Sequence, residues 1–251
     1  MNAYLCFVMN EDVVPYDELT LPKKKQVAMM FDRIAFRYDL MNHLLSFGID
    51  VSWRKKMVAT LRPHQPKTIL DVATGTADVA LLLSKLNPEK IVGLDISDEM
   101  LEIGRKKISE GRLGEMISLE NGDSENLLFQ SNKFDAATVA FGIRNFENLE
   151  KGLSEIYRVL KPGGHFVILE FSKPKTFPFK QLYHFYFTHV CPLLGQWITH
   201  DKQAYEYLHR SVSAFPEGNT LLSILKKTGF EQTQCKPLSF GISSLYTARK
   251  S

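Results

Sequence analysis

Short apolar segments alternate with amphipathic segments between residues 67 and 171, and this alternation constrains the fold more than any other feature of the chain. The apolar segments are rich in Val, Ile and Leu, and they predict strands at Thr68–Asp71, Ile91–Asp95, Ile117–Glu120, Phe134–Ala140 and His165–Glu170. The segments between them predict helices over Val79–Leu86, Asp98–Gly111 and Leu149–Leu160, the last followed by a stop and a turn at Lys161-Pro162-Gly163-Gly164. This order predicts a doubly wound, Rossmann-like α/β fold, with helices on both faces of a parallel sheet.

The segments outside this core are expected to belong to the same domain, because 251 residues suit one α/β domain with additions. A loose leader should end at Pro22, and residues 24–62 should form two or three amphipathic helices. Gly48 is expected to end the second helix, and Trp53–Leu61 to form the next. We therefore expect a single domain over 1–251 in four parts: leader and N-terminal helices (1–66), α/β core (67–171), helical lid (172–228) and closing strands (229–251), the last an antiparallel pair at Phe230–Leu238 and Ser243–Arg249.

Composition and charge exclude several classes of protein. A net charge of +3 without a dominant basic block argues against a nucleic-acid partner, and Lys23–Lys25 is expected to be a solvated face. Cys6, Cys191 and Cys235 lie far apart without the Cys/His spacing of a zinc site, so no metal is expected. No stretch approaches about 20 apolar residues, and the N-terminus resembles neither a secretory signal nor a transit peptide. These features predict a bacterial, cytoplasmic protein.

The loop from Asp71 to Asp78 follows the first predicted strand and has the composition of a ligand-binding turn. Gly75 lets the backbone turn tightly and approach a ligand, and Thr74 and Thr76 add hydrogen-bonding groups. The loop has neither the three glycines of a dinucleotide motif nor the lysine of a phosphate-binding loop. It therefore favours a ligand without a pyrophosphate.

Carboxylates also stand at the carboxyl ends of the next two predicted strands: Asp95 ends the second, and Asp123 follows the third. Asp95 can accept hydrogen bonds from both hydroxyls of a ribose, and Asp123 can accept one from an adenine amino group while the Ser124 backbone faces the ring. Taken singly, Asp95 could cap the next helix and Asp123 could be a turn residue. Because parallel strands end at one edge of a sheet, their order together with Gly75 favours a nucleoside cofactor.

The sequence resembles class I methyltransferases, and within them the ubiquinone/menaquinone-biosynthesis C-methyltransferases, from about Val27 to Lys250. The segments that carry the resemblance read FDRIAFRYDLMN (31–42), LSFG (45–48), WR (53–54), DVATGTAD (71–78), FGIRN (141–145), YRVLKPGG (157–164) and LEFSKP (169–174). The first of these and the long block from FGIRN to LEFSKP are specific to the family, whereas the glycine loop and the LKPGG within that block occur in many methyltransferases.

The resemblance implies that S-adenosylmethionine is the methyl donor and that no metal takes part. It implies cofactor contacts from Thr74, Asp95, Asp123 and Ser124, and we add Asp71, Gly75 and Tyr38 as further cofactor-binding candidates. Related sequences often have serine where this chain has Ala140, so a contact there would come from the backbone. The implied reaction converts demethylmenaquinol to menaquinol; the alternative acceptor is 2-methoxy-6-polyprenyl-1,4-benzoquinol of ubiquinone biosynthesis.

Arg144, Asn145 and Tyr38 are the candidate catalytic residues. Arginine stays protonated, so Arg144 would stabilise a phenolate or orient a water that takes the proton, unless it is a surface arginine paired with Glu147. Asn145 would position the same water or structure the loop, and Tyr38 with Asp39 would close over the cofactor or end a helix. Nothing in their spacing supports the remaining candidates by residue type, His184, His189 and His200.

The aromatic stretch from Phe177 to Phe187 could line an apolar route for an isoprenoid tail, touch a membrane surface peripherally or form a homodimer face. For Tyr183 and Phe187, spaced by four residues, the helical period favours core packing instead. Two other functions stay open: methylation of another small molecule or RNA, and a non-catalytic scaffold that keeps the cofactor pocket.

Overall fold

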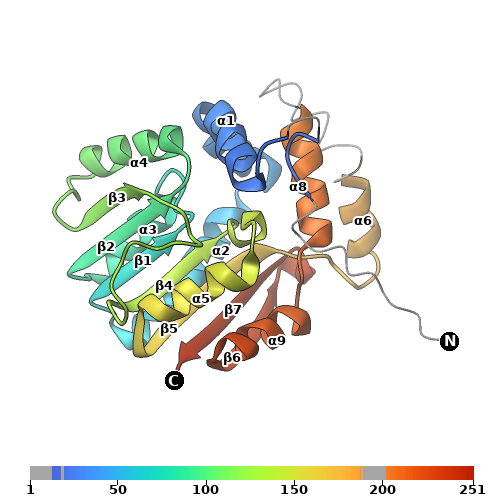
Figure 1. The fold of residues 1–251 in the computed structure, drawn as a ribbon. Helices are drawn as coiled ribbons and strands as arrows, with labels where there is room; N and C mark the ends of the chain where they lie inside the picture. The colour runs from blue at the N-terminus through green and yellow to red at the C-terminus, as the bar shows by residue number, and fades with distance from the viewer. Residues whose placement is uncertain (1–12, 18–19, 187, 189–201) are drawn as a thin grey trace.

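The computed structural model describes residues 13–17, 20–186, 188 and 202–251, and a seven-stranded sheet forms its centre (Figure 1). The strands are β1 (Thr68–Val72), β2 (Lys90–Asp95), β3 (Ile117–Asn121), β4 (Phe134–Ala140), β5 (Leu160–Phe171), β6 (Phe230–Leu238) and β7 (Ser243–Lys250). They lie in the order β3-β2-β1-β4-β5-β7-β6. Strands β1 to β5 pair in parallel, and β7 runs antiparallel to both of its neighbours. The predicted α/β class and the closing antiparallel pair are confirmed.

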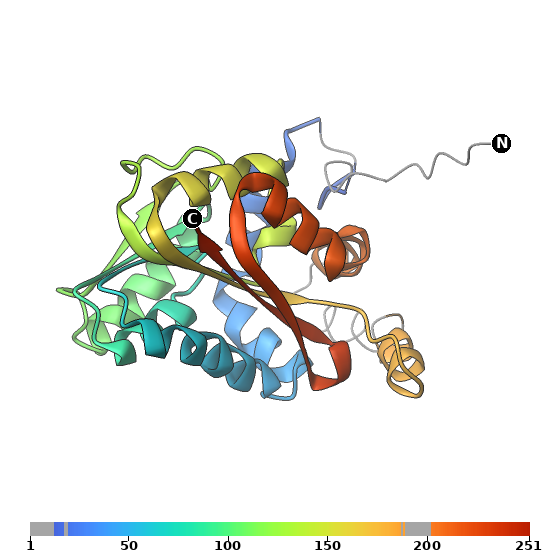
Figure 2. The same cartoon turned by 90° about the horizontal axis from the view of Figure 1, so that it is seen from below.

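Helices cover both faces of the sheet, and successive strand residues point to opposite faces. On one face Ile69 packs with α2 (Ile49–Leu61), α3 (Asp78–Leu83) and α4 (Asp98–Glu110). On the other, Leu70 packs with α5 (Leu149–Val159) and α9 (Asn219–Thr228). Figure 2 shows the two helical layers on either side of the sheet. The chain is therefore doubly wound, with a core on each face.

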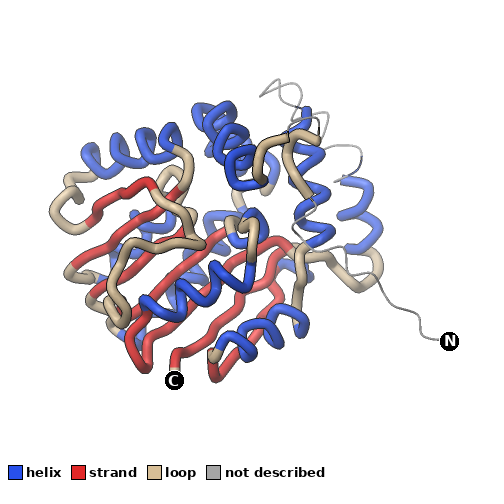
Figure 3. Tube along the Cα trace, in the orientation of Figure 1, coloured by secondary structure: helices blue, strands red, loops and turns tan. Residues whose placement is uncertain are grey.

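Three more helices gather beyond the carboxyl ends of the parallel strands: α1 (Lys23–Leu45), α6 (Phe179–Phe185) and α8 (Lys202–Ala214). Figure 3 shows them beyond one end of the sheet rather than against its faces. Their own apolar cluster includes Met30 and Ile34 of α1 and Tyr207 of α8. The helices thus form a roof over the edge where an open α/β sheet binds its ligands.

The N-terminal helices differ from the prediction. Lys23–Leu45 is one 23-residue helix, because no glycine or proline interrupts it. Gly48 therefore follows the first helix, not the second, and with φ +74° it directly precedes α2. Helix α2 begins at Ile49, four residues before the predicted start at Trp53.

Two other expectations need correction. The predicted stop after α5 is real, but Leu160 already pairs with Phe134, so β5 begins there rather than at His165. The residues between form an irregularity inside the strand, with Gly163 at φ +78°. The leader is not wholly loose either, because the Tyr16 side chain is buried and its backbone N–H donates to Gln26 Oε1 at 3.0 Å.

Candidate active site

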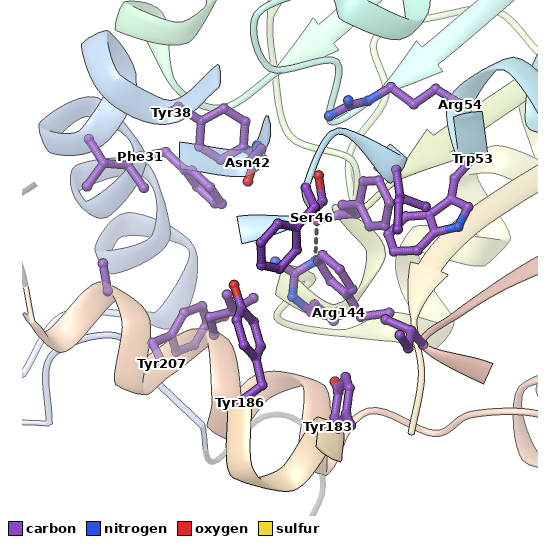
Figure 4. A pocket seen from close by; sticks show the side chains of 18 of the residues that line it. Phe31, Tyr38, Asn42, Ser46, Trp53, Arg54, Arg144, Tyr183, Tyr186 and Tyr207 are labelled. Atoms are coloured by element: carbon purple, nitrogen blue, oxygen red, sulfur yellow. Dashed lines mark hydrogen bonds between the residues drawn. The ribbon is translucent and has the colours of Figure 1, made fainter. Parts of the chain in front are cut away.

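Two neighbouring cavities lie between the carboxyl ends of the parallel strands and the roof of helices. The smaller, of about 80 Å³, lies over β1 to β4, and we call it the cofactor cavity. The larger, of about 470 Å³, lies under α1, α2, α6 and α8, and we call it the acceptor cavity (Figure 4). Phe31, Tyr38 and Phe141 line both cavities, so these three side chains form the wall that separates them.

Hydrogen bonds to Asp71 stabilise the loop that follows β1. Both oxygens of this buried carboxylate accept hydroxyl hydrogen bonds, one from Thr74 Oγ1 and one from Thr138 Oγ1, each at 2.6 Å. Burial raises the pKa of Asp71 to about 6. Gly75 reaches the cavity wall, whereas Asp71 and Thr74 do not line it. Asp71 and Thr74 thus hold the loop in place, and their contact with the cofactor stays a prediction.

Asp95, at the end of β2, ties this loop to the next strand. Its Oδ2 accepts from the Gly75 N–H at 2.8 Å, and its Oδ1 accepts from the Ser97 N–H at 3.0 Å. Burial raises the pKa of Asp95, and the two backbone hydrogen bonds oppose that rise. Asp95 lines the cofactor cavity, and each carboxylate oxygen can accept a further hydrogen bond.

Asp123 and Ser124 line the same cavity beyond β3, and Lys24 of α1 lies against Asp123. Lys24 Nζ is 2.8 Å from Asp123 Oδ2, 3.6 Å from Glu147 Oε2 and 3.7 Å from Glu125 Oε2. The hydrogen bond to Asp123 raises the pKa of Lys24. The expectation that Lys23–Lys25 is a solvated face is wrong, since Lys24 lines the cavity and Lys23 is only 3% exposed.

Arg144 lies in the acceptor cavity, in the short 3₁₀ helix that follows β4. It is 6% exposed, its Nη1 lies 2.9 Å from Glu170 Oε1, and Nη1 also donates to the Phe141 carbonyl. Burial raises the pKa of Glu170, and the positive charge of Arg144 reduces that rise. The alternative of a surface arginine paired with Glu147 is wrong, because Arg144 is buried and pairs with Glu170.

Asn145 and Tyr38 connect the two cavities. Asn145 lines the cofactor cavity, and its Oδ1 accepts from the hydroxyl of Tyr207, which lines the acceptor cavity, at 3.1 Å. Tyr38 belongs to the shared wall, and burial raises the pKa of its phenol. Its neighbour Asp39 accepts from Thr76 Oγ1 at 2.7 Å, which fastens α1 to the glycine loop.

The comparisons with known proteins give the family. The ubiE/COQ5 methyltransferase family matches residues 19–250. The chain belongs to that family. A demethylmenaquinone methyltransferase of Bacteroides fragilis is 49% identical over 96% of this chain and 98% of its own. A ubiquinone/menaquinone biosynthesis C-methyltransferase of Geotalea daltonii is 44% identical over 91% of this chain and 97% of its own.

Solved structures support the fold. The cyclase SpnF matches with a TM-score of 0.65 at 17% identity, over 90% of this chain and 96% of its own. A methyltransferase of Thermotoga maritima matches with a TM-score of 0.60 at 19% identity, over 89% of this chain and 99% of its own. The chain is thus a class I fold member and, by its family, a methyltransferase that depends on S-adenosylmethionine.

The cofactor cavity suits an adenosyl group in its chemistry. Asp95 and Asp123 supply acceptors for hydroxyl and amino donors, and a Cβ built on Gly75 would meet nothing within 4 Å, so the glycine borders open space. The volume of 80 Å³ is small beside the roughly 300–1,000 Å³ of most ligand pockets. Since Lys24 lies against Asp123, we expect it to withdraw when the cofactor binds.

We predict that Lys24→Met tightens S-adenosylmethionine binding about 2- to 5-fold, the range that one partly exposed ion pair can supply. The substitution removes a competitor for Asp123 and leaves a more negative cavity for a ligand with a sulfonium charge. Calorimetric titration would measure the change, with exposed Lys25→Met as the control. Weaker binding would show instead that Lys24 helps to hold the cofactor.

The sequence did not point to Glu170 as part of the site, and the structure gives no support to the histidine candidates that it describes. Glu170 is a carboxylate at the end of an apolar strand segment, an unusual position that could have marked it. Among the described residues no histidine lines either cavity, and His184 lies exposed on α6. His189 and His200 lie outside the described residues, as does Phe187. In the described part of the chain, no group of three His, Cys, Asp or Glu residues could hold a metal ion.

Helix α6 corrects the expectation of core packing. It has no buried residue, and Tyr183 lines the acceptor cavity together with Phe179, Leu182 and Phe185. Its aromatic side chains therefore form a cavity wall, which agrees with the alternative of an apolar route.

Proposed function

We propose that this methyltransferase transfers a methyl group to a ring carbon of a polyprenylated quinol, converting demethylmenaquinol to menaquinol. The observation that carries the proposal is the acceptor cavity: an aromatic-lined space of about 470 Å³ that shares one wall with the cofactor cavity. Relatives in Bacteroides fragilis, Porphyromonas gingivalis and Deinococcus radiodurans that bear the name demethylmenaquinone methyltransferase, at 41–49% identity, favour the naphthoquinol over the benzoquinol.

The proposed cofactor contacts follow the edge of the sheet. Asp123 and Ser124 would hold the adenine, Asp95 the ribose, and Gly75 would border the chain beyond it. Asp71 and Thr74 would act by shaping the loop, and Tyr38 would close the site from α1. When bound, S-adenosylmethionine supplies an electrophilic methyl group on a positively charged sulfur.

The acceptor side must raise the electron density of a ring carbon. Loss of the proton from a quinol hydroxyl does so, and a buried guanidinium such as Arg144 stabilises the resulting phenolate. Asn145 would help to position this side of the acceptor cavity through its hydrogen bond with Tyr207. The nearly apolar walls exclude water, which favours a reaction that neutralises opposite charges. In the net reaction a methyl group replaces the ring hydrogen, which leaves as a proton.

The test is methyl transfer from labelled S-adenosylmethionine to short-tail demethylmenaquinol, detected by mass spectrometry. The 2-methoxy-benzoquinol serves as the competing acceptor. A higher kcat/KM for the naphthoquinol supports the proposal, and preference for the benzoquinol would assign the chain to ubiquinone synthesis. Turnover of neither, with cofactor still bound, would favour another acceptor or a non-catalytic scaffold.

The mouth of the acceptor cavity supports a lipid surface as partner. The elements that form this cavity, and the segments next to them, also carry exposed apolar side chains, and we call these the apolar collar: Phe36, Leu40, Leu44, Phe47, Ile49, Phe177, Leu182, Phe185 and Phe240. The segment 173–185, which includes α6, carries Lys173, Lys175 and Lys180 but no acidic residue, which suits anionic headgroups. In the described ranges, no helix is long and apolar enough to cross a membrane. We therefore propose peripheral contact at the inner face of the cell membrane.

Phe36→Glu should lower binding to vesicles of phosphatidylglycerol and phosphatidylcholine about 10-fold or more, because one buried phenylalanine contributes about 1.5–3 kcal/mol. Phe36 is 91% exposed and lines neither cavity, so cofactor affinity should not change. Leu128→Glu, 89% exposed on the β3–β4 connection, is the control. Equal sedimentation of both variants would contradict the lipid assignment, and concentration-dependent dimers lost only in Phe36→Glu would make the collar a homodimer face.

A further inference from the structure

The strand order fixes the direction in which the cofactor must lie. With adenine held beyond β3 by Asp123 and ribose beyond β2 by Asp95, the remaining part of the molecule extends toward β1 and β4. Neighbouring strands are about 4.8 Å apart, so the amino-acid end reaches the wall formed by Tyr38 and Phe141. This step, and the inference built on it, rest on the cofactor placement proposed above.

The amino-acid end of S-adenosylmethionine carries a carboxylate, and an anion taken out of water needs a positive partner. Lys24 lies at the opposite end of the cofactor cavity, against Asp123. Lys107 lies near the glycine loop but lines neither cavity, and it pairs with Asp39 at 2.6 Å and Asp78 at 2.7 Å. Arg144 is assigned above to the acceptor phenolate, in a position fixed by Glu170. None of these three cations is therefore our candidate for the carboxylate.

Arg54 of α2 lies beside both the wall between the cavities and the helix that follows the glycine loop. It is 6% exposed and lines the acceptor cavity, with its Cζ 5.7 Å from the ring of Phe141, one of the three residues that separate the cavities. Its Nη1 lies 3.8 Å from Oδ2 of Asp78, the first residue of α3 after the glycine loop. Figure 4 shows Arg54 and Arg144 entering this space from different elements.

The guanidinium is charged and held in place. Nη1 pairs with Asp50 one turn earlier, and Ser46 Oγ donates to the other oxygen of Asp50 at 2.7 Å. Burial alone would raise the pKa of Asp50, but the Ser46 hydrogen bond and the Arg54 charge bring it below its ordinary value. Within the described part of the chain, both ion pairs of Arg54 run through Nη1. The guanidinium has further N–H donors on Nε and Nη2, in a planar fork that matches a carboxylate.

We infer that Arg54 binds the α-carboxylate of S-adenosylmethionine. Asp50 and Ser46 orient the guanidinium beside the wall between the cavities, and Asp78, which follows the glycine loop, lies 3.8 Å from Nη1. Arg54 thereby fixes the end of the cofactor opposite to the adenine. With both ends held, the sulfur between them has a defined position relative to the acceptor ring.

The test compares two ligands that differ only in this group: S-adenosylmethionine and its decarboxylated form. Calorimetry without acceptor should show that the wild-type protein prefers the carboxylate form. Arg54→Met should weaken S-adenosylmethionine about 10- to 100-fold, the effect of a charged hydrogen bond, and change the decarboxylated ligand less than about 3-fold. Lys55→Met, at the exposed neighbouring position on α2, should preserve the wild-type preference.

Loss of Arg54 leaves Asp50 buried without its main partner, so the double variant Asp50→Asn/Arg54→Met serves as a second test. It should show the same loss of preference. A parallel loss for both ligands would overturn the inference and make Arg54 structural. Unchanged cofactor affinity with a raised KM for the quinol would overturn it in favour of an acceptor role. Failure of the wild-type protein to bind either ligand would instead contradict the proposed placement of S-adenosylmethionine in the cofactor cavity.

Discussion

Arg144→Met should lower kcat about 100- to 1,000-fold, the loss that follows removal of one buried donor to a developing oxyanion. The dissociation constant of S-adenosylmethionine should change less than about 3-fold, because we assign Arg144 to the acceptor phenolate and the cofactor carboxylate to Arg54. Single-turnover kinetics with the quinol would give kcat, and calorimetry would give the cofactor affinity. This pattern would separate a group that serves the acceptor from one that serves the donor.

The substitution leaves the carboxylate of Glu170 buried and unpaired, which can destabilise the fold. The double variant Glu170→Gln/Arg144→Met removes that charge and should show the same loss of turnover. Arg62→Met, at an exposed position after α2, is the matched control and should keep full activity. Loss of cofactor binding in Arg144→Met would show that our division of roles between the two cavities is wrong.

Asp95→Ala should abolish measurable cofactor binding, with a loss of about 100-fold or more, since two hydrogen bonds to a charged acceptor disappear together. The same change removes the acceptor for the Gly75 N–H and so loosens the glycine loop. Thermal shift and calorimetric titration with S-adenosylmethionine would measure it. The catalytic defect should follow from the binding defect.

Asp98→Ala is the control for this experiment, because Asp98 is an exposed carboxylate three residues further along the chain. It should leave the cofactor affinity unchanged. An Asp95→Ala protein that binds S-adenosylmethionine as tightly as the wild type would remove the ribose role. The proposed direction of the cofactor along the sheet would then rest on the adenine contact at Asp123 alone.

Much of the sheet could be predicted because its signals are local. The predicted strand Phe134–Ala140 agrees with β4 at both ends. As expected, Asp95 ends β2 and Asp123 follows β3. Apolar runs of this kind, separated by helices, permit little other than a parallel sheet. The start of β5 was harder to predict from the sequence, because a proline and two glycines normally indicate a turn rather than the inside of a strand.

The side-chain partners at the site were not predictable in the same way. Lys24 and Asp123 are 99 positions apart in the chain, and Arg144 and Glu170 are 26 apart. Spacing within a helix or strand carries no information on such pairs. They depend on where α1 and β5 lie relative to the loops at the edge of the sheet.

The sequence by itself determined the α/β architecture, the three strand ends suited to a nucleoside, and the methyltransferase family. These rest on hydrophobic periodicity and on short motifs, which act over a few residues. Only the tertiary structure decided that Lys24 lies inside the cofactor cavity, that Glu170 holds Arg144, and that Arg54 reaches the wall between the cavities. A buried charge must find its partner wherever the packed fold provides one, and that choice is made by the arrangement of whole helices and strands.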